Sequence, residues 1–248
     1  HPPFNQTAQP FLTALFYLSL LGPCLDSDIG QLLEGRHIVY GEIGQNLLAK
    51  LDNVGIVGGA FWENGFREMT NSKHPITCVD DLKGMKIRTM TNDLHVDYFK
   101  YLGALPTPMA FNELYTAMQQ GTVDGQENPT AMIWNNNIYE VQKYMTVSEH
   151  IWTSTSLCIA EDFLESLPQD YQDAIREAGA NTTALQAEMI TEENQSLLSN
   201  IEAAGVEVTT LSDEAKAEFQ QKAKESVWVT AAKLYGQDLI DLADSFNQ

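Results

Sequence analysis

The chain has 248 residues, 44% of them hydrophobic, which suffices for one large domain or two smaller domains with cores of their own. Its 34 acidic and 14 basic side chains give a formal net charge of −20. This charge excludes nucleic acid and an anionic membrane surface as the main partner, but it permits a small anionic ligand held by two or three buried cations.

The one long apolar run, FLTALFYLSLLG, occupies residues 11–22. It is shorter than the roughly 20 residues of a transmembrane helix, so no membrane insertion is expected. It also lacks the basic leader and the small-residue cleavage site of a signal peptide, which favours a buried core segment. Cys24, Cys78 and Cys158 have no CxxC spacing and are expected to be small buried hydrophobic residues.

The first half of the chain alternates strand-like and helix-like segments. Strands are predicted at 53–62 and 85–90, and helices at 79–84, 93–103 and 111–121. Asp80 is the expected cap of the first helix and Gly84 its end, while Asn112 and Gly121 bound the third. The alternation predicts an α/β fold with a mostly parallel sheet.

The second half contains one unusually long helical segment. After a predicted strand at 154–160, residues 168–204 have helix-forming composition, with Pro168 suited to the first turn, Gly179 a candidate bend and Gly205 the end. Such a helix is roughly 50 Å long at about 1.5 Å per residue, which favours a helix shared by two domains. A strand at 206–210 and helices at 213–236 and 237–246 complete the prediction.

Catalytic motifs are absent from the sequence. There is no GxSxG, HExxH, P-loop or GxGxxG pattern, and the five histidines have no metal-ligand spacing. The chain therefore predicts neither a metal site nor a cofactor. An acid pair in a cleft stays open as an alternative, because carboxylates are abundant.

The arginines are more informative, since there are only four. Arg88 lies near the C-terminal end of a predicted parallel strand, where open α/β sheets bind ligands, and a guanidinium there favours a carboxylate. The alternative is a contact with a surface aspartate. Arg67 follows a glycine turn after a strand and is expected in a second loop at a sheet end.

The segment PTPMAFNELYTAMQQGTVDGQENP, residues 106–129, concentrates polar residues around a helix. Asn128 precedes Pro129, which favours extended backbone, so its amide either meets a ligand or caps the next helix. Phe111 either faces a pocket or forms a hydrophobic staple. Three residues are expected to serve mainly as turn and scaffold: Asp124, Gln126 and Glu127.

Four segments in this order, FWENGFREMTNS, DLKGMKIRTM, LGALPTPMAFNELYTAMQQGTVDGQENP and YEVQKY, resemble the DctP-type solute-binding proteins of TRAP transporters. The resemblance runs from about Gly41 to the C-terminus, and the third segment is also similar to the sialic-acid-binding branch. It implies a two-domain periplasmic-binding-protein (Venus-flytrap) fold with a long helix spanning both domains. Domain I would comprise 1–66 and 153–192, and domain II 67–152 and 193–248.

The function that the resemblance implies is a periplasmic receptor rather than an enzyme. It would capture a C4-dicarboxylate, uronate or other sugar acid without a cofactor and deliver it to the TRAP membrane permease. Arg88 matches the main carboxylate-binding arginine, Arg67 a second arginine, Asn128 the amide beside them and Phe111 a pocket aromatic. Trp152 matches a variable pocket position.

Residues 1–40 depart from the family pattern, in which a strand, a helix and a second strand come first. We therefore expect domain I to be incomplete at its N-terminus, with a sheet edge and apolar surface left exposed. Two other functions stay open at this point. One is a small-molecule enzyme with a carboxylate pair in a two-domain cleft, and the other is an interaction protein without a ligand.

Overall fold

The computed structural model describes residues 39–237 and 240–241. These residues form two compact units, which are called unit 1 (39–65 and 152–192) and unit 2 (66–151, 193–237 and 240–241). The predicted core segment at 11–22, Cys24 and most of the predicted helix at 237–246 lie outside the described residues. In the part of the chain that is described, no helix is long and apolar enough to cross a membrane.

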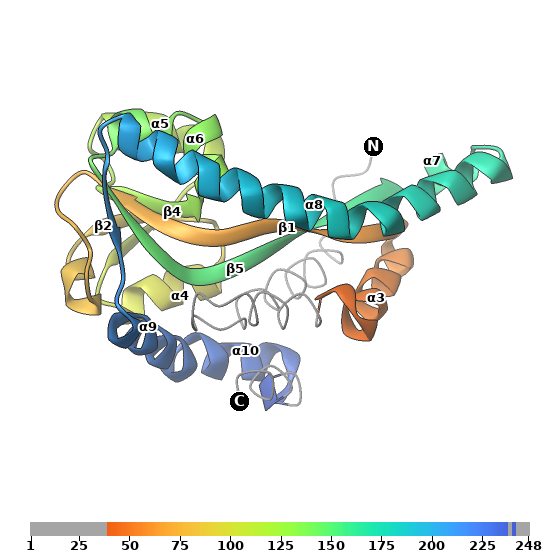
Figure 1. The fold of residues 1–248 in the computed structure, drawn as a ribbon. Coiled ribbons are helices and arrows are strands. Elements are labelled where there is room, and N and C mark those ends of the chain that lie inside the picture. The colour runs from red at the N-terminus through yellow and green to blue at the C-terminus, as the bar shows by residue number, and fades with distance from the viewer. Residues whose placement is uncertain (1–38, 238–239, 242–248) are drawn as a thin grey trace. The chain divides into compact units, whose positions relative to one another are not determined.

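The strands form a six-stranded sheet in the order β3-β2-β4-β1-β5-β6 (Figure 1). Strand β2 pairs in parallel with β3 and β4, and β5 pairs in parallel with β6, whereas β1 and β4 are antiparallel. The α/β class predicted from the sequence is confirmed, with an antiparallel pair at the centre of the order. The strands are β1 (Ile56–Asn71), β2 (Lys86–Thr89), β3 (Leu105–Pro108), β4 (Gly125–Pro129), β5 (Tyr144–Ala160) and β6 (Glu207–Thr210).

The helices connect these strands as the alternating pattern predicts. The α-helices are α3 (Glu42–Ala49), α4 (Asp93–Tyr101), α5 (Phe111–Gln119), α6 (Thr130–Asn135), α7 (Glu161–Glu165), α8 (Gln169–Ala203), α9 (Asp213–Glu225) and α10 (Val227–Tyr235). The 3-10 helices are η1 (Lys50–Val54), η2 (Val79–Leu82) and η3 (Ile138–Val141).

Helix α8 confirms the long helix predicted at 168–204. Its 35 residues continue through Gly179, and they divide between unit 1 and unit 2 after Glu192. Gly179 packs closely against β1, since a Cβ there would lie 3.4 Å from the Gly59 carbonyl oxygen. Gly205, with φ of 97°, follows the helix in the left-handed conformation that glycine favours.

Three predicted helix boundaries were wrong. Asp80 does not cap η2, whose N-cap is Cys78, and Asp81 accepts the backbone N–H groups of Thr77 and Cys78 at 2.7 and 3.2 Å. Helix α5 begins at Phe111 with Ala110 as its N-cap, so the cap predicted at Asn112 was two residues too late. The helix predicted over 213–236 is interrupted at Ser226, which separates α9 from α10.

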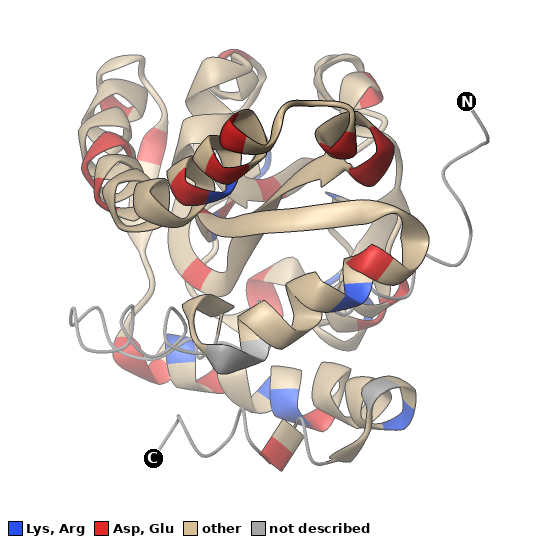
Figure 2. Cartoon of the chain, turned by 90° about the vertical axis from the view of Figure 1, so that its right-hand side faces the viewer, with Lys and Arg blue, Asp and Glu red and all other residues tan. Residues whose placement is uncertain are grey.

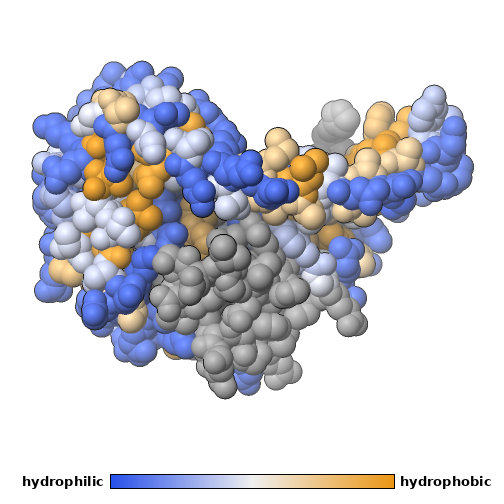
Figure 3. Space-filling model, viewed as in Figure 1, coloured by the Kyte–Doolittle hydropathy of each residue, from blue (hydrophilic) through white to orange (hydrophobic). Residues whose placement is uncertain are grey.

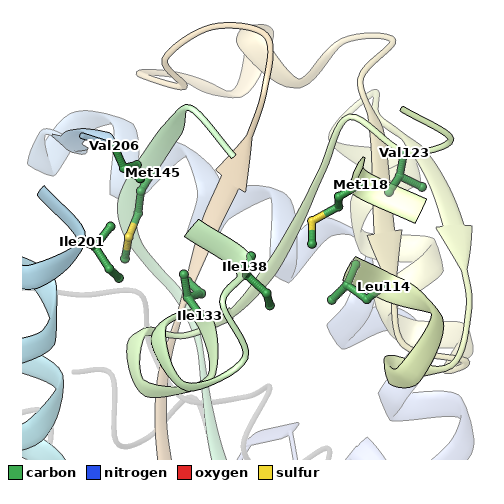
Figure 4. Packing of buried hydrophobic residues seen from close by; sticks show 8 residues of the cluster. All are labelled: Leu114, Met118, Val123, Ile133, Ile138, Met145, Ile201 and Val206. Atoms are coloured by element: carbon green, nitrogen blue, oxygen red, sulfur yellow. The ribbon is translucent and has the colours of Figure 1, made fainter. Parts of the chain in front are cut away.

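The core of unit 2 packs the inner faces of α5, α6 and α8 against β5. Figure 4 shows the buried side chains of this cluster, which come from segments far apart in the sequence. Their burial removes apolar surface from water, the main favourable term in folding. The cluster consists of Leu114, Met118, Val123, Ile133, Ile138, Met145, Ile201 and Val206.

The surface matches the acidic composition, but it also carries apolar residues. Red acidic positions far outnumber blue basic ones on the helices in Figure 2. In unit 1, Leu185 and Met189 of α8 are 57% and 60% exposed. Figure 3 shows hydrophobic residues in orange along this helix. Cys158 is exposed and Cys78 partly buried, so the prediction of buried cysteines was wrong for Cys158.

Candidate functional site

Strand β4 buries three consecutive polar side chains in the middle of the sheet. The sequence predicted turn and scaffold residues at Gln126 and Glu127, yet all five residues of Gly125–Pro129 are buried in a strand between β2 and β1. Gln126 and Glu127 are fully buried and Asn128 is 4% exposed. Because a buried polar group without a partner is costly, these side chains must be satisfied by neighbouring residues.

Glu127 is satisfied chiefly by Arg67. The Arg67 Nε donates to Glu127 Oε2, and its Nη2 donates to Glu127 Oε1 at 3.0 Å and to the Glu127 carbonyl oxygen at 2.7 Å. Arg67 itself lies inside β1 and is 2% exposed, so the prediction of a loop at a sheet end was wrong. The glycine that suggested a turn, Gly65, has φ of 102°, but the strand continues through it.

Two histidines complete the surroundings of the Glu127 carboxylate. His95 Nδ1 lies 3.6 Å from Oε1, and His150 Nε2 lies 3.6 Å from Oε2, both on fully buried side chains. Burial raises the pKa of Glu127, but the Arg67 charge and hydrogen bonds from His150 and His95 hold it well below its usual range. Burial lowers the pKa of His95, which favours its neutral form.

The sequence showed no metal-ligand spacing among the histidines and no reason to group them. His95 and His150 are distant in sequence, but α4 and β5 bring them to one carboxylate. The described residues nonetheless contain no group of three or more His, Cys, Asp or Glu that could hold a metal ion.

Arg88 lies near the C-terminal end of β2, beside Gln126 of β4 and Thr107 of β3, and it is 3% exposed. Its Nε and Nη2 donate to the Met109 carbonyl oxygen at 3.1 and 2.9 Å, which fixes the plane of the guanidinium. Burial lowers its pKa, the nearby Glu127 charge opposes this, and Arg67 adds to it. An arginine nevertheless stays charged in proteins.

The alternative that Arg88 pairs with a surface aspartate is wrong. Within the described residues no carboxylate lies within 4.0 Å of its guanidinium nitrogens, although Arg67 and Lys216 both have such partners. Phe111, the first residue of α5 and 37% exposed, has its ring centroid 5.8 Å from the Arg88 guanidinium carbon. Arg88 is therefore a buried cation with an aromatic face beside it and no counter-charge of its own.

Both the oxygen and the nitrogen of the Asn128 side-chain amide form hydrogen bonds within the chain. Its Oδ1 accepts from Arg67 Nη2 at 3.0 Å, and its Nδ2 donates to Gln126 Oε1 at 2.5 Å. The alternative of a side-chain cap for the next helix is wrong, because Pro129 is the N-cap residue of α6 and no side chain caps it. Unit 2 thus brings together four of the five predicted site residues: Arg67, Arg88, Phe111 and Asn128.

Trp152, the fifth predicted residue, belongs to unit 1. It is 4% exposed and donates from Nε1 to Glu63 Oε1 at 3.0 Å. Gln186 of α8 holds the backbone of Glu63 through both its amide atoms, at 2.7 and 2.8 Å. Trp152 is therefore part of a hydrogen-bonded group in unit 1, and its role in ligand binding stays a prediction.

Three residues that dominate the electrostatics of this site were not predicted as site residues: Glu127, which was expected to be scaffold, His95 and His150. The signal for Glu127 was its place in a string of polar residues between a glycine and a proline. No local signal identified the histidines, since only the fold brings them together.

Comparisons with known proteins show the family of this chain. A family model described as bacterial extracellular solute-binding protein, family 7 (DctP), matches residues 34–233. The 2,3-diketo-L-gulonate-binding periplasmic protein YiaO of Escherichia coli is 35% identical over 170 residues, covering 68% of this chain and 52% of that protein. The C4-dicarboxylate-binding periplasmic protein DctP of Rhodobacter capsulatus is 36% identical over 185 residues, covering 74% and 55%. The chain therefore spans about half the length of these two relatives.

Solved structures give the same result at the level of the fold. The sugar acid binding protein DctPAm from Advenella mimigardefordensis, in complex with galactonate, has a TM-score of 0.83 and 32% identity and covers 95% of this chain and 76% of its own. A TRAP periplasmic solute binding protein from Polaromonas, bound to D-erythronate, has a TM-score of 0.81 with the same identity and coverage. These similarities confirm the predicted fold class.

Proposed function

Because the chain belongs to bacterial extracellular solute-binding protein family 7, we propose that it is an extracytoplasmic receptor that captures a small organic acid. On this proposal it acts in the periplasm and hands the acid to the membrane permease of a TRAP transporter. Unit 1 and unit 2 are then the two ligand-binding domains. The proteins of known ligand that it resembles support a sugar acid or a C4-dicarboxylate as the substrate class.

The observation that carries this proposal is the state of Arg88. A buried guanidinium without a carboxylate partner in the described chain is costly unless a ligand supplies the negative charge. The Met109 carbonyl oxygen occupies Nε and one hydrogen of Nη2, so the Nη1 side is left for a ligand. A carboxylate there would form charge-assisted hydrogen bonds, with the Phe111 ring against the guanidinium.

Arg67 and Asn128 have a supporting role in this proposal. Most of the hydrogen-bonding capacity of Arg67 is directed to Glu127 and Asn128, and the described residues offer no acceptor to its Nη1. Arg67 thus holds Asn128 in place and adds positive potential, while its Nη1 is a second donor for the same carboxylate.

The alternative of an enzyme with a carboxylate pair finds no support. Each of the buried carboxylates Glu63, Glu68 and Glu127 accepts hydrogen bonds from the chain itself, so none is positioned as a free acid or base. The family and its solved members are binding proteins.

A thermal-shift panel tests the proposal. The acids are D-galactonate, D-galacturonate, D-erythronate and succinate, each with the parent chain and with Arg88→Ala. An acid at about 100 times its Kd stabilises the folded state by about 2.7 kcal/mol, which raises Tm by roughly 5–10 °C for a chain of this size. We expect this rise for at least one acid, and its loss in Arg88→Ala.

The matched control is Arg176→Ala, which removes an exposed arginine of α8 and is expected to keep the full rise. Circular dichroism checks that Arg88→Ala is folded. The absence of a rise with every acid in the parent chain would contradict the receptor function and favour an interaction protein without a ligand. A full rise in Arg88→Ala would show that another residue binds the carboxylate.

A further inference from the structure

Glu68 is a buried carboxylate that the proposed ligand contacts do not use. It follows Arg67 on β1 and is 5% exposed. Its Oε2 accepts the backbone N–H groups of Ser148 and Glu149, at 2.6 and 3.0 Å. Glu149 is one of two non-glycine residues with positive φ in the described chain, at 47°. The Glu68 carboxylate therefore holds β5 in a conformation that this backbone seldom adopts.

A line of buried contacts runs from this point to Arg67. The Ser148 hydroxyl lies 2.8 Å from His150 Nδ1, 3.4 Å from the Arg67 carbonyl oxygen and 3.5 Å from Glu68 Oε2. The other imidazole nitrogen of His150, Nε2, lies 3.6 Å from Glu127 Oε2, and Glu127 is paired with Arg67. Glu68 is thus connected to the Glu127 carboxylate through two side chains of β5.

The charges that act on Glu68 come from two elements, β5 and α9. Burial raises its pKa to about 7, and the negative charge of Glu149 on β5 adds to this rise. The two backbone N–H groups and Lys216 of α9 oppose it, and Lys216 Nζ is itself paired with Glu149 Oε2 at 2.6 Å. His150 on β5 is connected to Glu68 through the Ser148 hydroxyl. Glu68 therefore changes charge in the physiological pH range.

We propose that Glu68 is a positioning residue for the carboxylate site, because its side chain decides how Ser148 is hydrogen-bonded to His150 and thereby how His150 meets Glu127 and Arg67. The inference deepens the proposed function and rests on it for its effect on ligand binding. The contacts from Glu68 to Glu127 do not depend on the ligand.

The two charge states of Glu68 favour different hydrogen bonds. An ionised Glu68 only accepts hydrogen bonds, so it competes with the Arg67 carbonyl oxygen and with His150 Nδ1 for the Ser148 hydroxyl proton. When Glu68 is protonated this competition is lost, and the hydroxyl donates to His150 Nδ1 in a larger share of molecules, which favours the imidazole form whose Nε2–H faces Glu127.

Nitrogen-15 NMR of the histidine side chains tests this inference without any ligand. The imidazole shifts of His150, assigned with His150→Gln, are followed between about pH 5.5 and 8.5 in the parent chain and in Glu68→Gln. We expect the parent and Glu68→Gln profiles to differ by an inflection near pH 7, because Glu68 titrates there only in the parent. Coincident profiles in the two chains would overturn the proposal.

Two further variants separate the relay from a general effect on the fold. Glu113→Gln removes an exposed carboxylate of α5 and should leave the His150 profile unchanged. Ser148→Ala keeps the backbone N–H groups that Glu68 binds but removes the hydroxyl, so it should abolish the inflection as Glu68→Gln does. An unchanged profile in Ser148→Ala would contradict a relay through this hydroxyl.

Calorimetry with the acid that gives the largest thermal shift adds the functional readout. The Kd of the parent is expected to change by at least about threefold between pH 6 and 8, and that of Glu68→Gln by less, since one pKa unit corresponds to tenfold in an equilibrium constant. A pH dependence equal in both would contradict the inference. If no acid binds the parent, the proposed function fails, and the NMR result still decides whether Glu68 controls His150.

Discussion

The Arg67 guanidinium of β1 donates to both carboxylate oxygens and to the carbonyl oxygen of Glu127 on β4, and both side chains are buried, at 2% and 0% exposure. This ion pair joins the antiparallel strands at the centre of the sheet order. Because Asn128 is bound to the same guanidinium, the pair also fixes the amide next to the proposed carboxylate site. Fold stability and ligand geometry therefore depend on the same contact.

Replacing Glu127 with glutamine should destabilise the chain strongly. The substitution keeps the shape but leaves Arg67 charged and buried without a counter-charge, which costs about 3–5 kcal/mol in comparable sites. Urea denaturation measures this as a fall in the free energy of unfolding. The exposed Glu113→Gln serves as the control, with an expected change within about 0.5 kcal/mol. A loss below about 1 kcal/mol in Glu127→Gln would show that the pair contributes little to stability.

Glu68 should make the chain less stable as pH rises through neutrality. Its pKa is about 7 in the folded state against 4.5 ordinarily, so between these values the folded chain binds a proton that the unfolded chain has released. Stability is therefore full below about pH 4.5 and declines as pH rises through the folded pKa, by up to about 3 kcal/mol. Glu68→Gln does not titrate and should lack this decline.

Urea denaturation of the parent and Glu68→Gln at several values between pH 5 and 8 checks the sign. The difference between the two free energies should move in favour of the variant as pH rises. All other titrating groups are common to both chains and cancel in that difference. Parallel curves would mean that Glu68 has an ordinary pKa in the folded chain.

Phe111 should contribute to affinity through its contact with Arg88. In Phe111→Leu the apolar volume is largely kept while the aromatic face, 5.8 Å from the guanidinium carbon, is lost. A cation–π contact at a partly exposed site contributes about 0.5–1 kcal/mol, which corresponds to roughly a two- to fivefold rise in Kd. Calorimetry with the best acid of the panel measures it. Phe163→Leu, on an exposed residue of α7, is the matched control and should leave the Kd unchanged.

The sequence was sufficient to predict an element where its local residue pattern agrees with the fold. The long helix α8 could be predicted because helix-forming residues continue from Pro168 to Gly205 without a break, and each of those two residues favours one end. Arg88 could be placed near the end of a parallel strand, because the short segment Lys86–Thr89 has β-branched Ile87 and Thr89 on alternate residues and is followed by a helix.

The sequence was insufficient where only pairing with other strands decides the structure. Strand β4 reads Gly-Gln-Glu-Asn-Pro and has no β-branched or aromatic residue, so no strand propensity marks it. It is a strand because it pairs with β1 on one side and with β2 on the other. Arg67 and the two histidines surround the carboxylate of its Glu127. For this reason the Glu127 carboxylate was predicted to be only a turn or scaffold residue.

The same close packing of β4 against β1 makes Gly125 the position where a single methyl group should be least tolerated. A Cβ at Gly125 would lie 2.2 Å from the Thr70 carbonyl oxygen and 2.8 Å from the Asn71 Cβ, and neither atom can rotate away. Strand β4 would have to move away from β1, and this movement would separate the Glu127 carboxylate from the Arg67 guanidinium. Overpacking typically costs 1–3 kcal/mol, and because backbone must shift here, we expect Gly125→Ala to lose about 3 kcal/mol in urea denaturation.

Gly59 of β1 offers a matched comparison for this prediction. A Cβ there would lie 3.5 Å from the Leu157 carbonyl oxygen, an ordinary van der Waals distance, and the residue does not have positive φ. Gly59→Ala should therefore be neutral or stabilise the chain by up to about 1 kcal/mol, since alanine restricts the unfolded chain. Equal effects of the two substitutions would show that the spacing between β4 and β1 does not limit stability. A loss confined to Gly125→Ala, accompanied by weaker acid binding, would instead show that this spacing sets the position of the Glu127–Arg67 pair.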